Sequence, residues 1–119
     1  MFDLNKTLFP GIPAAAQVHV GFRDAHATTA NIVLNEVKRL MAEKGTRSVT
    51  TIGHSLGGAL AELDALFLTL NIPTASVKAV TYGTPRVGNP EFVAFFDTKV
   101  TNFKRINNEY GVYSLSSCK

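Results

Sequence analysis

Residues 48–58 read SVTTIGHSLGG, and this stretch decides the fold. Its first five residues, 48–52, are β-branched or small and are typical of a short strand that ends at Gly53. From Leu56 onward, apolar residues recur at helical spacing. The stretch therefore predicts a strand, a tight turn centred on Ser55, and a helix.

The segments around this unit also alternate between strand and helix. Short β-branched stretches predict further strands over residues 17–20, 77–82 and 100–106. Alternating units of this kind imply an α/β fold, with a parallel sheet of about four strands and flanking helices. Residues 1–16 are predicted to be irregular, because proline and glycine interrupt them, and residues 110–119 have no clear period.

Two more helices are predicted from apolar spacing and capping residues. The first begins near Asp24 and ends at Gly45, and its apolar face is made of Ala30, Val33, Val37, Leu40 and Met41. The second is short, with Asn89 as the cap, Pro90 at the first helical position and Glu91 in the first turn. The apolar face of the helix after the tight turn is made of Leu60, Leu63, Phe67 and Leu70.

Composition and charge exclude several classes of protein. The chain has 119 residues, 45% of them hydrophobic and 18% charged, which is typical of a globular domain. The net charge is +3, and the basic residues are scattered, so we predict a solvated surface and no nucleic-acid partner. The single cysteine, Cys118, forms no internal disulfide. The first residues do not read as a secretory signal, and the sequence assigns no compartment.

The motif that carries chemistry is Gly53-His54-Ser55-Leu56-Gly57, a G-x-S-x-G pattern between a strand and a helix. In such a turn the serine is held in a strained conformation that lifts its hydroxyl clear of the sheet. Side chains at Gly53 and Gly57 would clash there. The helix N-terminus would stabilise negative charge on a substrate oxygen, with the backbone N–H of Leu56 as one donor. Ser55 is thus a candidate nucleophile.

A second interpretation of the same residues is a glycine-rich packing or phosphate-binding turn. In that case Ser55 would be an ordinary helix cap, and Gly58 would help to form a phosphate cradle. Neither G-x-x-x-x-G-K-[ST] nor G-x-G-x-x-G occurs here, so nucleotide binding is disfavoured.

Four blocks of sequence, residues 18–22, 52–61, 81–89 and 105–108, resemble the class 3 (fungal-type) lipase family of α/β-hydrolases. The resemblance covers about residues 17–109, as a partial α/β-hydrolase domain, with residues 110–119 as an unrelated tail. It implies hydrolysis of carboxylic esters, typically triacylglycerols, without a cofactor or a metal. A lipid or small ester would be the substrate, and a lipid–water interface would be a contact of the longer form.

The resemblance also implies roles for single residues. Ser55 would be the nucleophile and Leu56 a backbone oxyanion donor, while Arg86 and Asn89 would hold the loop and cap the short helix. His54 would point away from Ser55 and would not be the general base. The nucleophile elbow is completed by Gly53, His54, Gly57 and Gly58.

The pattern of the family is incomplete in this chain. In α/β-hydrolases the order of the triad is serine, acid, histidine, but the histidines here are His19, His26 and His54, which all precede Ser55. The family's aspartate is expected within a few residues after Asn108, where the chain continues with glutamate. Asp97 is interpreted as a solvated acid of the short helix.

We therefore expect a truncated family member that is inactive or weakly active. Three functions stay open: an ester hydrolase, a non-catalytic binding or scaffold protein or non-functional product on the same fold, and an acyl transferase. An unpaired strand edge and uncovered apolar residues predict self-association.

Overall fold

The computed structural model describes residues 1–106 together with the backbone of residues 114–115. Three features considered in the sequence lie outside these residues: the position after Asn108 where an aspartate is expected, the glutamate that the sequence has there, and Cys118.

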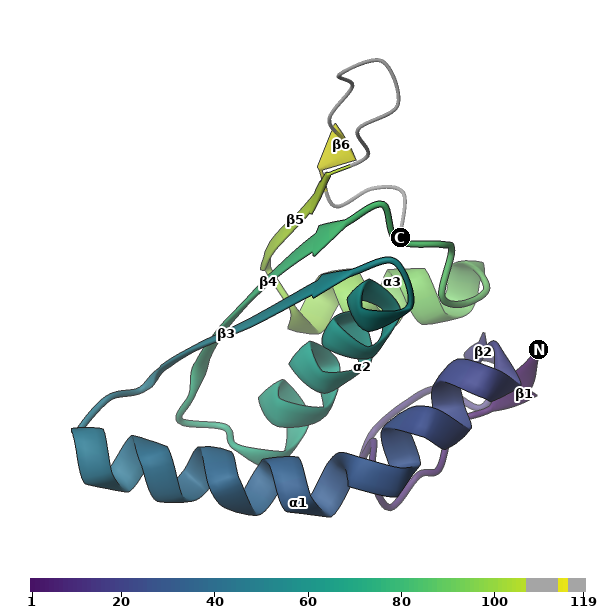
Figure 1. The fold of residues 1–119 in the computed structure, drawn as a ribbon. Helices are drawn as coiled ribbons and strands as arrows, with labels where there is room; N and C mark the ends of the chain where they lie inside the picture. The colour runs from purple at the N-terminus through teal and green to yellow at the C-terminus, as the bar shows by residue number, and fades with distance from the viewer. Residues whose placement is uncertain (107–113, 116–119) are drawn as a thin grey trace.

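The main sheet is parallel, as predicted, but over three strands instead of about four. β3 (Ser48–His54), β4 (Ser76–Tyr82) and β5 (Asn102–Ile106) lie side by side in this order (Figure 1). A short fourth strand, β6 (Ser114–Leu115), pairs antiparallel with β5. The sequence, in which residues 110–119 have no clear period, did not predict this pairing, which adds residues 114–115 to one edge of the sheet.

The strand predicted over residues 17–20 does not join this sheet. Only β2 (Gln17–Val18) is extended, and it pairs antiparallel with β1 (Phe2–Asp3) as a separate two-stranded sheet. The backbone N–H of His19 donates to the carbonyl of Val87 at 3.1 Å, and the chain then enters a helix. The prediction failed because this pairing joins segments that are distant in sequence, which a local pattern does not reveal.

The first helix is also longer than predicted. α1 runs over Val20–Lys44, whereas the capping signals had suggested a start near Asp24. The helical period continues backward from Ala30 through the buried His26 to the half-buried Phe22. The apolar pattern did not predict this earlier start, because a polar residue, His26, occupies one of the core positions. The predicted end at Gly45 is confirmed, because Gly45 adopts the left-handed conformation that suits a helix C-terminus.

Two helices, α2 (Leu56–Asn71) and α3 (Pro90–Lys99), complete the chain as predicted. α2 packs on β3 and β4 and also contacts α1 and α3. Along β4 and β5, buried residues alternate with more exposed ones, so the helices cover one face of the sheet. Among the described helices, none combines the length and apolar character that a membrane span requires.

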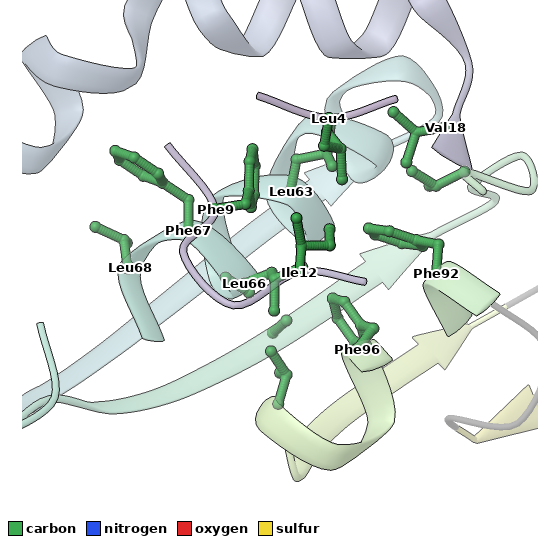
Figure 2. Close-up of a cluster of buried hydrophobic side chains, with 14 of the residues drawn as sticks. Leu4, Phe9, Ile12, Val18, Leu63, Leu66, Phe67, Leu68, Phe92 and Phe96 are labelled. Atoms are coloured by element: carbon green, nitrogen blue, oxygen red, sulfur yellow. The ribbon is translucent and has the colours of Figure 1, made fainter. Parts of the chain in front are cut away.

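The N-terminal segment is part of the hydrophobic core, although most of it is irregular. Leu4, Phe9 and Ile12 are buried and point into the same cluster as Leu63 and Phe67 of α2 (Figure 2). Residues 1–16 therefore act as a cover for α2. The prolines and the glycine of this segment correctly predicted its irregular structure. They gave no sign that its apolar side chains are buried, because burial depends on what the segment packs against.

Candidate active site

Ser55 stands at the junction between β3 and α2. Its backbone has φ 54° and ψ −121°, and among the described non-glycine residues it alone has a positive φ. Its N–H donates to the carbonyl of Tyr82 at 2.9 Å, which ties the turn to the neighbouring strand. A side chain in this conformation costs on the order of 1–3 kcal/mol. The strained serine predicted from the sequence is therefore present.

The glycines around Ser55 do not all serve the same purpose. A side chain at Gly53 would overlap the backbone of Gly57, as expected for so tight a turn. At Gly57 itself the space is open, so the predicted clash there is wrong. At Gly58, in contrast, a side chain would overlap that of Thr84. Gly53 and Gly58 are thus the two positions at which the elbow excludes a Cβ atom.

The N-terminus of α2 carries free donors beside the serine. The N–H groups of Gly58 and Ala59 donate to the carbonyl of Ser55 at 2.9 and 3.3 Å. Within the described part of the chain, the N–H groups of Leu56 and Gly57 donate to no backbone carbonyl. The side chain of Ser55 makes no capping hydrogen bond. This contradicts the interpretation of Ser55 as an ordinary helix cap and leaves the first-turn donors available to a ligand oxygen.

A buried polar layer supports the elbow from below. Arg105 of β5 is 7% exposed and its guanidinium donates to the carbonyl of Thr84. Thr84 is 3% exposed, and its side chain lies where a Cβ atom on Gly58 would be. Glu62 of α2 and Thr81 of β4 are also fully buried polar residues. The loop after β4 is therefore fixed against the first turn of α2 by contacts that the motif does not reveal.

The predicted roles of Arg86 and Asn89 in that loop are confirmed. The Arg86 guanidinium donates to the carbonyl of Gly88 at 3.3 Å. The Asn89 side chain accepts from the N–H of Phe92 at 2.9 Å and so caps α3. It also accepts from the N–H of Gln17 at 3.0 Å and donates to the carbonyl of residue 15 at 2.8 Å. One side chain thus joins the loop, α3 and the N-terminal segment.

His54 lies at the end of β3, opposite Tyr82 in register. The alternation along β3 puts its side chain on the exposed face of the sheet, whereas α2 covers the other face. A Cβ atom on Gly83 would lie 3.8 Å from its Nε2. This arrangement agrees with the expectation that His54 points away from the reacting group, which stays a prediction.

The other two histidines have structural surroundings. His19 is exposed and precedes α1, with its ring 5.4 Å from that of Phe22. His26 is 2% exposed, and its Nε2 lies 3.0 Å from Oδ1 of Asp64, although neither atom makes a well-aligned hydrogen bond. Asp64 follows Ser55 by two and a half helical turns, which is about 13 Å along α2. The His26–Asp64 pair therefore joins α1 to α2 and is too distant to activate Ser55.

The remaining acid considered in the sequence, Asp97, is exposed on α3. In the described part of the chain, no group of three or more histidine, cysteine, aspartate or glutamate side chains is arranged to hold a metal ion. Among the described residues, the turn thus combines the strained Ser55 with first-turn N–H groups that donate to no backbone carbonyl.

Sequence reasoning missed Thr84 and Arg105. Thr84 lies in a loop and Arg105 is one of several scattered basic residues, so neither has a local signal. One pattern could have indicated Arg105. Phe103 and Arg105 lie on the same face of β5, so the alternation places a charged residue among buried ones.

A strained serine between a parallel strand and a helix defines the nucleophile elbow of an α/β-hydrolase, here in partial form. The chain matches the family described as Lipase (class 3) over residues 2–111. It therefore belongs to the class 3 lipase family. The match begins well before residue 17, where the resemblance in sequence was expected to start, and includes the segment that covers α2.

Individual relatives agree with this family. A secreted mono- and diacylglycerol lipase of Malassezia globosa is 34% identical over 98 residues, which are 82% of this chain and 32% of the relative. The phospholipase A1-II 1 of Oryza sativa subsp. indica is 49% identical over 70 residues, 56% of this chain and 18% of that protein. The structure of lipase II from Rhizopus niveus superposes with a TM-score of 0.76 at 32% identity, covering 82% of this chain and 38% of that one. The chain spans about a third of the length of the Malassezia relative.

Proposed function

We propose that this chain carries the nucleophilic part of a carboxylic ester hydrolase of the lipase type, with Ser55 as the nucleophile. The observation that supports this most directly is the strained backbone of Ser55 at the start of α2. Structures retain such strain where function requires the geometry. A serine that only capped the helix would need neither the positive φ nor the buried contacts around Gly53 and Gly58.

The proposed reaction proceeds by acyl transfer to Ser55. Its Oγ attacks the ester carbonyl carbon, and the carbonyl oxygen becomes negative within reach of the N–H groups of Leu56 and Gly57. The hydroxyl proton passes to a base and then to the departing alcohol. Water afterwards attacks the acyl carbon, the base takes a proton from this water and returns it to Oγ, and the carboxylic acid is released.

The proposed substrate is a lipid ester. The Malassezia relative is named for mono- and diacylglycerols and the rice relative for phospholipids, which share an acyl ester bond. The side chain of Leu56 is 53% exposed beside Ser55, and an apolar residue in that position would favour contact with acyl chains at a lipid–water interface.

Weak activity is proposed for the chain by itself. Its three histidines all precede Ser55, and His26 is held by Asp64 in the core. Without a base and an acid, an oxyanion site and substrate binding still accelerate hydrolysis by up to about a thousandfold over the uncatalysed reaction in water. The position of the three histidines before Ser55 also favours a second candidate function. In this case the chain would be a non-catalytic protein that binds an ester or an acyl chain at the turn around Ser55.

The test is covalent labelling by a fluorophosphonate probe, run beside hydrolysis of a short-chain and a long-chain ester. Labelling and turnover that are lost in Ser55→Ala support the hydrolase. Turnover that yields a new ester when a primary alcohol is added would instead indicate the acyl transferase. If a cooperatively folded sample is not labelled and does not hydrolyse either ester, the hydrolase proposal fails and the non-catalytic function is favoured.

Self-association is part of the same proposal. The uncovered face of the sheet exposes Ile52 at 67% and Tyr82 at 41%, with Val80 half-buried between them. Burial of such apolar surface between copies is favourable. Analytical ultracentrifugation of the chain and of Ile52→Lys tests this, since the charged variant should shift the distribution towards monomer.

A further inference from the structure

Residues 5–7, Asn5-Lys6-Thr7, form the acceptor pattern for N-linked glycosylation, which is Asn-x-Ser/Thr with a middle residue other than proline. The chain has eight asparagines, and only this one stands two residues before a serine or a threonine. A pattern of three residues also occurs by chance. Its position in the fold therefore has to show whether the asparagine can carry a sugar.

The turn that holds this pattern lies at the surface between two buried anchors. Leu4 is 5% exposed and Phe9 is 1% exposed, and both side chains point into the hydrophobic cluster (Figure 2). The three residues of the pattern itself are exposed. Because the core fixes the segment on both sides of the turn, the acceptor pattern is presented to solvent in one defined place.

The main chain of the turn orients the side-chain amide of Asn5. Its Oδ1 accepts from the backbone N–H of Thr7 at 2.7 Å and from that of Leu8 at 3.3 Å. A backbone N–H can only donate, so the side-chain atom that faces the turn is the oxygen. Nδ2, the atom to which a sugar is linked, therefore lies on the other side of the amide. Among residues 1–106, no protein group accepts a hydrogen bond from it.

A sugar on Nδ2 is compatible with the folded turn. In N-linked glycosylation this nitrogen forms a bond to the anomeric carbon of an oligosaccharide, and the bond from that carbon to a lipid-linked diphosphate breaks. The nitrogen loses one proton, and the diphosphate leaves with its lipid. Oδ1 takes no part in these bond changes and stays an acceptor in the product. It can therefore still accept from Thr7 and Leu8 when the sugar is in place.

A hollow beside Asn5 offers room for the first sugar. It has a volume of about 300 Å³ and lies between the N-terminal segment and the first half of α1, with Asn5, Leu8 and Ala27 among its lining residues (Figure 1). Arg23 and Asp24 also line it, and the Arg23 Nε donates to the Asp24 carboxylate at 3.0 Å. Sugar hydroxyls can donate to that carboxylate, which has further acceptor positions.

We propose that Asn5 is the attachment site of an N-linked oligosaccharide when this chain passes through a eukaryotic secretory pathway. A Malassezia relative is named as a secreted lipase, and secreted proteins are the ones in which this pattern is used. The oligosaccharide would stand over the N-terminal segment, outside the hydrophobic core. This inference is independent of the proposed hydrolysis, because Asn5 belongs neither to the nucleophile elbow nor to its donors.

The test is expression of the whole chain behind a cleavable secretion signal in a eukaryotic host, followed by mass measurement before and after treatment with an amidase that releases N-linked glycans. Medium and cell lysate are both analysed, because the oligosaccharide is attached before export and a retained chain carries it as well. We expect the amidase to remove the mass of one oligosaccharide. Peptide mapping should locate the carboxylate that the release leaves at position 5.

Thr7→Ala and Thr7→Ser form a matched pair. The hydrogen bond from residue 7 to Oδ1 comes from the main chain, so both variants keep the turn. Only serine keeps the hydroxyl that the acceptor pattern requires. We expect Thr7→Ala to lose the oligosaccharide entirely and Thr7→Ser to keep it. Asn5→Gln should lose it as well.

Thermal unfolding tests whether the sugar and the turn coexist. The Tm of the glycosylated chain should equal or exceed that of Thr7→Ala, because the two hydrogen bonds to Oδ1 persist in both. Asn5→Ala should melt below Thr7→Ala, because it removes the acceptor from both N–H groups.

The proposal fails if neither the secreted nor the retained chain loses mass on amidase treatment, or if Thr7→Ala is still glycosylated. It also fails if the carboxylate maps to another position. A glycosylated chain that melts below Thr7→Ala would refute the arrangement of the amide, since the sugar would then displace the hydrogen bonds that form the turn.

Discussion

Replacement of Gly58 by alanine tests how the nucleophile elbow is held. An alanine Cβ at this position would overlap the Thr84 hydroxyl and would lie 3.0 Å from the Thr84 Cβ and 3.2 Å from its Cγ2. The neighbouring Gly57 offers a matched control in the same helical turn, because a Cβ there meets no atom within 4 Å. The two substitutions add the same methyl group and differ in what it meets.

The expected magnitude follows from two opposing terms. Overpacking of a filled site costs about 1–3 kcal/mol, while alanine exceeds glycine in helix propensity by about 1 kcal/mol. Gly58→Ala should therefore destabilise the chain by about 0–2 kcal/mol. Gly57→Ala should be neutral or stabilise it by up to about 1 kcal/mol. For a chain of this size, about 1 kcal/mol corresponds to about 4 °C in Tm.

The assay is thermal unfolding of both variants, followed by circular dichroism at one protein concentration. A third variant, Gly58→Ala combined with Thr84→Ala, removes the hydroxyl and the methyl group that the new Cβ would meet. Its loss of unfolding free energy should be smaller, by about 1 kcal/mol, than the sum of the losses in Gly58→Ala and Thr84→Ala. Equal Tm shifts for Gly57→Ala and Gly58→Ala, or no recovery in the double variant, would refute the reasoning.

Two further predictions follow from the strained serine and from the N-terminal cover. Ser55→Gly should raise the free energy of unfolding by about 1 kcal/mol relative to Ser55→Ala, because glycine adopts the positive φ without strain; chemical denaturation measures this, and equal stabilities would contradict it. Phe9→Ala should cost about 3–5 kcal/mol, because Phe9 is 1% exposed and packs against His26 and Phe67. Phe2→Ala is its control at 53% exposure, and a similar loss in both would mean that residues 1–16 do not cover the core.

The local sequence determined the units of the fold and the centre of the site. β-branched stretches defined β3 and β4, and the apolar spacing defined α2. The G-x-S-x-G pattern predicted the strained serine, and Asn89 with Pro90 predicted the start of α3. These features depend on residues within a turn or two of each other, so their physical causes are contained in short stretches of chain.

Only the tertiary structure decided what these units pack against. β2 pairs with β1 instead of the main sheet, Gly58 rather than Gly57 is the crowded glycine, and Arg105 holds Thr84 from the next strand. The burial of Phe9 is of the same kind. Each depends on contacts between residues far apart in the chain, and periodicity and turn chemistry carry no information about which distant surfaces will meet.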